Sequence, residues 1–98
     1  MGAPVFIGDE VAAAGFRLAG ADIRIPPPGA EAATLEAARA AAQLVMIDAA
    51  VARRLPAELL RAAVRATAPV TVVVPDLQGE AASPDLAQRL RRQLGLDA

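Results

Sequence analysis

Four short runs of apolar residues, spread along the whole chain, are the feature of this sequence that most limits its fold. They are Val5–Ile7, Ile23–Ile25, Leu44–Ile47 and Val70–Val74. Each run is too short for a buried helix and is followed by a glycine, proline or aspartate, which is typical of strands. In the second run Ile23 and Ile25 alternate with Arg24, which is typical of a short strand near the edge of a sheet. The segments between them are rich in alanine, leucine, arginine and glutamate, which favour helices. The sequence therefore predicts alternating strands and helices.

The helix boundaries can be predicted from capping residues. Asp9 is a good N-cap for a first helix that runs through Leu18 and ends near Gly20. The segment 30–42 predicts a second helix, and residues 49–54 a helical turn. Pro56 suits the first position of a further helix that ends at Ala66. The inner face of that helix is predicted to comprise Leu59, Leu60, Ala63 and Val64.

The C-terminal part of the chain predicts a loop followed by one last helix. The stretch from Pro75 to Ala82 has the composition of a loop or hinge, and Ser83-Pro84-Asp85 is a strong helix start. We expect the last helix to end at Gly95. The chain then divides into a receiver-like α/β core, residues 1–75, and a hinge loop with a C-terminal helix, residues 76–98.

This alternation predicts an α/β fold built on a parallel sheet. Continuous apolar strands joined by helical crossovers are typical of a parallel sheet covered on both faces. Right-handed crossovers then favour a small doubly wound fold with four strands, in the flavodoxin or receiver order, with the C-terminal helix added.

The residue types that are missing exclude many enzyme mechanisms. The chain has no histidine and no cysteine, so it can form neither Ser-His-Asp nor Cys-His catalytic groups, nor disulfides. Zinc sites built on imidazole or thiolate are excluded as well. All ten basic residues are arginines, so there is no lysine for a Schiff base or a phosphate-binding loop. We predict no cofactor, no metal and no catalytic residue.

The charge balance and the hydropathy pattern bear on partners and location. Ten arginines face eleven acidic residues, a net charge of −1, which gives no electrostatic reason to expect nucleic acid or an anionic membrane surface. No apolar run reaches the roughly 18 to 20 residues of a membrane span, and the N-terminus lacks the positive start of a signal peptide. We therefore expect a soluble, cytoplasmic protein that does not insert into the membrane.

Three acidic residues form the strongest candidate for a catalytic group. Asp9, Glu10 and Asp48 follow the first and third predicted strands, whose carboxyl ends meet at the crevice of a doubly wound sheet. Three carboxylates there could bind Mg²⁺, as in a response-regulator receiver phosphorylated on Asp48. Against this hypothesis, such a receiver also uses a lysine, and this chain has none. The simpler interpretation is that Asp9 and Asp48 each cap a helix.

The last predicted helix is amphipathic and basic. Leu86, Leu90 and Leu94 recur at helical spacing, and Arg89, Arg91 and Arg92 lie on other faces. One interpretation is a helix packed on the sheet with solvated arginines. The other is a detachable arm that docks on a partner, and both can hold in different states.

Taken in order, these segments resemble the F subunit of the V/A-type ATPases, a small component of the central stalk. The first matching segment is Phe6-Ile7-Gly8-Asp9-Glu10 with Gly15-Phe16-Arg17-Leu18-Ala19-Gly20. The others are the strand from Leu44 to Asp48, the valine-rich strand before Pro75, and the tail Leu90-Arg91-Arg92-Gln93-Leu94-Gly95-Leu96. Together they span nearly the whole chain.

The resemblance implies a mechanical and non-catalytic role. In this family the F subunit binds the coiled-coil D subunit one to one, and the pair forms the rotor axle inside the catalytic A/B ring. The axle transmits torque between ATP turnover and proton or sodium transport, beside other rotor subunits in the part of the complex peripheral to the membrane. The C-terminal helix of the family changes position and modulates ATPase activity. By this resemblance we predict partner contacts at Phe16, Arg17, Leu86, Arg89, Leu90 and Arg92.

Overall fold

The computed structural model describes residues 2–75, Gln88 and Arg92. Strands and helices alternate in residues 2–75 as the sequence predicts. The elements in chain order are β1 (Val5–Ile7), α1 (Glu10–Leu18), β2 (Asp22–Arg24), α2 (Glu31–Ala41), β3 (Leu44–Asp48), α3 (Ala49–Ala52), α4 (Ala57–Arg65) and β4 (Val70–Val74). Of the predicted last helix, the description includes Gln88 and Arg92, which are both helical and exposed.

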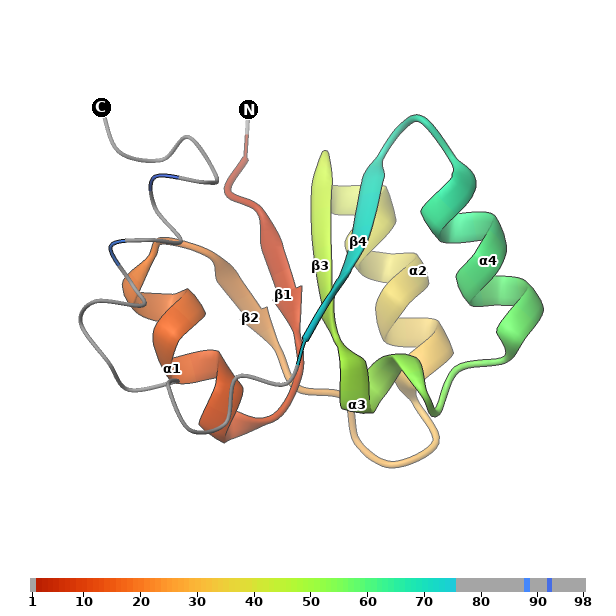
Figure 1. Cartoon of the computed structure of the whole chain (residues 1–98), viewed down its shortest axis with the longest axis horizontal. Coiled ribbons are helices and arrows are strands. Elements are labelled where there is room, and N and C mark those ends of the chain that lie inside the picture. Colours follow the sequence, from red (N-terminus) through yellow and green to blue (C-terminus); the bar gives the residue numbers. More distant parts are fainter. Residues whose placement is uncertain (1, 76–87, 89–91, 93–98) are drawn as a thin grey trace.

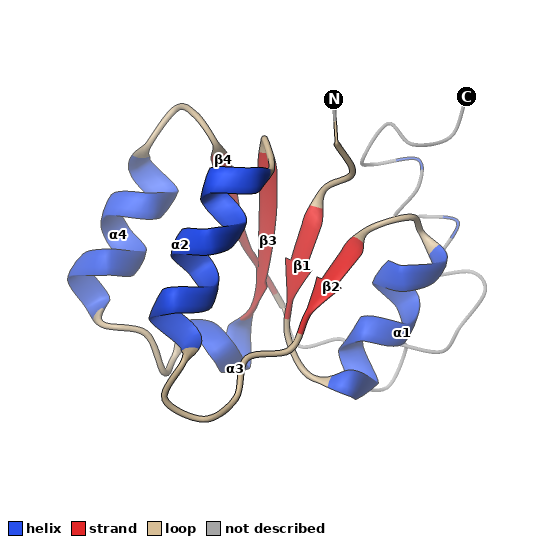
Figure 2. Ribbon diagram, turned by 180° about the vertical axis from the view of Figure 1, so that it is seen from behind, coloured by secondary structure: helices blue, strands red, loops and turns tan. Residues whose placement is uncertain are grey.

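The four strands form a single parallel sheet in the order β2-β1-β3-β4 (Figure 1). Because β1 pairs with both β2 and β3, the chain starts at the middle of the sheet and winds outward in both directions. This arrangement confirms the predicted doubly wound, flavodoxin-like fold. Helix α1 covers one face of the sheet, and α2, α3 and α4 cover the other (Figure 2).

The larger part of the core lies between the sheet and helices α2, α3 and α4. Side chains alternate between the two faces of a strand, so β1 and β3 each send every second residue to this side. The strand residues are Val5, Ile7, Val45 and Ile47, and the buried helix and loop residues are Leu35, Ala38, Ala42, Val51, Ala52, Leu55 and Ala63. Most of the helix contributions are small, which allows close packing on the sheet.

The smaller part of the core lies under α1. Phe6 of β1 and Met46 of β3 point to this face and meet Phe16 on the inner side of α1. Ala12, Ala13 and Ala21 complete this cluster. Asp9 accepts a hydrogen bond from the Ala12 N–H at 2.8 Å, so the predicted N-cap is confirmed and fixes where α1 begins.

Strand β4 is covered less completely than the sequence predicts. Its registered partners in β3 place Val70 and Val72 on the α1 side of the sheet, and these side chains are 47% and 39% exposed. Thr71 points to the opposite side, under α4, and is buried. Among the described residues, α1 buries Phe6 and Met46 on this face, and Val74 of β4 packs against the same cluster, whereas Val70 and Val72 stay exposed.

Three local predictions were wrong. Strand β2 ends at Arg24, and Ile25 is 44% exposed, because Pro26 follows and has no N–H to continue the ladder. Pro56 occupies the N-cap of α4 with extended backbone rather than the first helical position. Val64, assigned to the inner face of α4, is 47% exposed, because α4 lies at the edge of the sheet and buries a narrow stripe centred on Ala63.

Candidate functional site

The carboxyl ends of β1 and β3 carry the acidic residues that the sequence singles out. Asp9 caps α1 as described above, and Asp48, the last residue of β3, accepts a hydrogen bond from the Ala50 N–H at 3.3 Å. Asp48 is buried, with 2% of its surface exposed. The interpretation of both aspartates as helix caps is therefore confirmed.

The third acidic residue, Glu10, points away from this pair. It is exposed and lies 3.8 Å from Arg17, which follows about two turns later along α1. In residues 2–75, 88 and 92, no three acidic side chains are grouped in a way that could hold a metal ion. The receiver hypothesis, with Mg²⁺ held by Asp9, Glu10 and Asp48, therefore gains no support from the geometry.

Gly8 brings the chain close to both neighbours at this edge. A Cβ at position 8 would collide with the ring of Phe6 and lie 3.1 Å from the Cβ of Asp48. The Gly8 N–H donates to the Arg24 carbonyl at 3.1 Å. The Gly-Asp pair after β1 is thus required by packing at a tight turn, which explains it without a bound ligand.

The predicted partner contacts on α1 divide into one core residue and one surface residue. Phe16 is 1% exposed and stacks on Phe6, so in this structure its ring is a core side chain and does not face solvent. The Arg17 side chain is 55% exposed and is available to a partner. Gly15, which precedes Phe16 in α1, is buried.

The other predicted contacts belong to the C-terminal segment. Arg92 is helical and exposed. Leu86, Arg89 and Leu90 lie outside the described residues. The structure therefore brings Arg17 to the surface and places Arg92 on a helix, and it leaves the predicted contact surface as a hypothesis.

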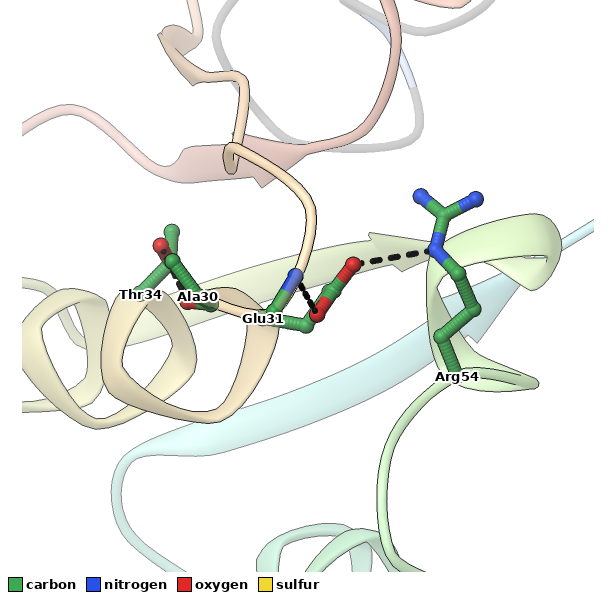
Figure 3. Close-up of polar contacts among 5 residues, drawn as sticks. Ala30, Glu31, Thr34 and Arg54 are labelled. Carbon is green, nitrogen blue, oxygen red and sulfur yellow. Dashed lines mark hydrogen bonds and ion pairs between the residues drawn. The ribbon is translucent and has the colours of Figure 1, made fainter.

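The structure reveals a polar contact that sequence reasoning missed. Glu31, at the start of α2, is 7% exposed and accepts hydrogen bonds from the Gly29 N–H at 3.0 Å and from Arg54 Nε at 3.1 Å (Figure 3). It ties the proline-rich loop before α2 to the turn after α3. Gly29 has a φ of 88°, a conformation that glycine adopts readily. The sequence Pro28-Gly29-Ala30-Glu31 was the signal from which the contact between Gly29 and Glu31 could have been predicted.

A second missed feature is a groove along one flank of α4, where Leu60 also packs partly against the core. Ala57, Leu60, Arg61, Val64 and Arg65 line a shallow surface groove of about 570 Å³, which is mostly apolar. The amphipathic pattern of the helix predicted an inner apolar stripe. Val64, which belongs to that predicted stripe, instead lies at the surface.

Comparison with protein families identifies the chain. The model of the ATP synthase (F/14-kDa) subunit family matches residues 5–93. The chain belongs to this family. The resemblance to the F subunit of the V/A-type ATPases is therefore confirmed over nearly the whole sequence. The family is that of a central-stalk component of the ATP synthase complex. No curated protein and no solved structure has a significant match to the chain.

Membership of this family also bears on whether the chain has a catalytic role. The F subunit is an accessory component of the ATP synthase complex, and its family is generally non-catalytic. In the part of the chain that the structure describes, no helix is both long and apolar enough to cross a membrane.

Proposed function

We propose that this F-family chain is a rotor component: it binds the coiled-coil D subunit one to one, and the pair transmits torque through the central stalk. The family match over residues 5–93 carries this proposal. The rotor drives or is driven by the A/B catalytic ring, which it contacts transiently, and it couples ATP turnover to proton or sodium transport. It works beside other rotor subunits, on the cytoplasmic side, in the peripheral sector of the complex.

The acidic edge of the sheet supports a mechanical role. Asp9 and Asp48 are both engaged in capping helices, and no lysine is present to complete a receiver-type site. A protein that transmits torque needs a stable body and contact surfaces and does not need a reactive group.

The C-terminal segment supports the regulatory part of the proposal. The chain leaves the described core at Pro75, directly after β4, and β4 presents Val70 and Val72 at its surface. We propose that the arm carrying Leu86, Arg89, Leu90 and Arg92 changes position and thereby modulates ATPase activity. Its arginines and Arg17 supply charge for partner contacts.

The experiment is a reconstitution of the ATPase complex with the full chain, without it, and with a chain that ends at Ala82. We expect ATP-driven ion transport to fall without the chain, because the axle is incomplete. The truncated chain is expected to fold, to restore transport, and to change the rate of ATP hydrolysis. Unchanged transport in the complex lacking the chain would refute the torque role, and an unchanged hydrolysis rate on truncation would refute the regulatory role.

A further inference from the structure

The two edges of the sheet differ in how well they are protected against pairing with another chain. Strand β2 forms one edge, has three residues, and exposes the charged residues Asp22 and Arg24. Short, charged edge strands of this kind resist the addition of a further strand. Strand β4 forms the other edge (Figure 1), has five residues, and contains neither a charged residue nor a proline. By the same criteria, β4 is an unprotected edge.

The free edge of β4 presents backbone groups and apolar side chains together. The Val70 N–H donates to the Gln43 carbonyl at 2.9 Å, so every second residue from Val70 onward turns its backbone N–H and C=O groups toward β3. Val73 therefore turns these groups outward, and no hydrogen bond joins them to another described residue. Val73 is 42% exposed, whereas Thr71 is buried under α4. The open part of the edge is thus the second half of the strand.

Helix α4 overhangs this edge with an apolar flank. The helix packs against β4, the last strand of the sheet. Ala63 points into the core, and Val64 lies about 100° further round the helix. In a right-handed crossover from β3 to β4, that direction leads past the free edge. Val64 lines the groove on α4 together with Ala57 and Leu60, so a strand added to β4 would lie beside this groove.

The rim of the same groove is positively charged. Arg61 and Arg65 line it, and both are exposed. Arg61 pairs with Glu58 at 2.9 Å, whereas no ion pair joins Arg65 to another described residue. A strand that carries carboxylates on its α4 side and apolar residues on the side of Val72 would complement this edge in charge and in hydropathy.

A second copy of the chain fits this edge poorly. Its β4 would supply valines but no carboxylate, and the overhanging helices of the two copies would bring Arg61 and Arg65 of each close together. Like charges that meet across an interface lower the affinity. The edge therefore favours a different chain, whose strand carries acidic residues.

We propose that the free edge of β4 is a strand-addition site for an extended, acidic segment of a partner protein. The added strand pairs with the backbone of Val73, places apolar residues beside Val72, and directs acidic residues toward Arg61 and Arg65. In strand addition, backbone hydrogen bonds provide affinity and alternate side chains provide specificity. One added strand buries little surface, so we expect a weak, transient contact. The proposal does not depend on the rotor role.

The test is a titration of the full chain with short synthetic peptides, followed by nuclear magnetic resonance of the backbone amides. The probe peptide alternates valine with glutamate, and the control peptide alternates valine with lysine. We expect the probe to shift the amide of Val73, to slow its exchange with solvent, and to bind about fivefold more tightly than the control. Ile23, which faces outward from the protected strand β2 because Asp22 bonds toward β1, should show no shift.

Two variants of the chain test the side chains of the site. Arg65→Glu and Val72→Asp should each lower the affinity for the probe peptide about fivefold. Arg24→Glu and Ile25→Asp are matched controls beside the β2 edge, since Ile25 is 44% exposed, and both should stay within about twofold of the unchanged chain. Circular dichroism shows whether each variant folds, and if Val72→Asp does not, Arg65→Glu decides.

The possible results distinguish the site from its alternatives. A probe peptide that does not bind, or that leaves the Val73 amide unshifted, would overturn the strand-addition site. Equal binding of the lysine peptide, or binding that Arg65→Glu leaves unaltered, would overturn the acidic partner. Shifts at Val73 that grow with protein concentration in the absence of peptide would overturn the proposal in favour of a second copy. All of these results leave the rotor role standing.

Discussion

The rings of Phe6 and Phe16 lie parallel, with their centroids 4.0 Å apart and an angle of 6° between their planes. They are the only aromatic residues of the chain. Phe6 belongs to β1 and Phe16 to α1, so this one stack joins the helix to the middle of the sheet. The remaining residues of α1 in this part of the core are alanines, which leaves the stack as its main apolar anchor.

We expect Phe16→Ala to destabilise the protein by about 3–5 kcal/mol, because it removes a fully buried ring and opens a cavity. Phe16→Leu, which keeps most of the volume, should cost clearly less. Urea unfolding followed by far-ultraviolet circular dichroism measures both. A loss below about 1 kcal/mol for Phe16→Ala would show that α1 is held mainly by other contacts.

Gly8→Ala is expected to cost about 1–3 kcal/mol, because the added methyl group meets a ring that is already held by stacking. The ring of Phe6 is fully buried and cannot swing away. Gly2→Ala is the matched control, since nothing lies within 4 Å of a Cβ there, and its stability should not change. Equal melting temperatures for the two variants would contradict the predicted crowding at position 8.

The contacts of Glu31 predict an asymmetry between its two partners. Glu31→Ala removes the acceptor of both hydrogen bonds, from the Gly29 N–H and from Arg54, and should cost about 1–3 kcal/mol. Arg54→Ala removes a side chain that is 55% exposed, so the ion pair is screened and its loss should cost less than about 1 kcal/mol. Chemical denaturation of both variants tests the order. A larger loss for Arg54→Ala would mean that the ion pair dominates.

Thr71→Val is expected to stabilise the protein by about 1 kcal/mol. The Thr71 hydroxyl is buried under α4 and has no hydrogen-bond partner among the described residues, and a buried hydroxyl without a partner is costly. Valine has nearly the same shape and suits a strand. The thermal midpoint should rise, and a fall of several degrees would indicate that the hydroxyl is satisfied by a group such as a bound water.

We expect that a small phosphodonor does not phosphorylate the aspartates at the carboxyl ends of β1 and β3. Incubation with Mg²⁺ and acetyl phosphate should add no mass to the chain, because Asp48 serves as a helix cap and lacks the grouped acids of a metal site among the described residues. Asp9→Ala, at the other cap, should cost about 1 kcal/mol and leave ATPase coupling intact. A phosphate adduct that Asp48→Ala removes would revive the receiver hypothesis.

The strands and caps could be predicted because local signals determine them. The run Val5–Ile7 and the cap at Asp9 occur where the sequence places them. The exposure of Val64 could not be predicted, because periodicity identifies an apolar face but not how much of a sheet lies beneath it. Strand β4 is an edge strand, and that follows only from the assembled topology.

The polar contacts and the surfaces were harder to predict than the fold. Glu31 and Arg54 are 23 positions apart, and no local pattern pairs them. Phe16 was predicted to contact a partner because it lies in a segment that resembles the family. In a chain with two aromatic residues, however, burying a large ring in the core contributes most to stability. Arg17, its neighbour on α1, points outward because adjacent residues on a helix face in different directions.

The central claim is that this chain is one half of a rotor axle. The most direct measurement is native mass spectrometry of the chain mixed with the coiled-coil D subunit of the same complex, in moderate salt. We predict a single complex with one copy of each chain. If the protein instead stays monomeric and well folded in the presence of its intended partner, the claim is contradicted. The chain would then share the fold of its family without sharing the binding to the coiled-coil subunit.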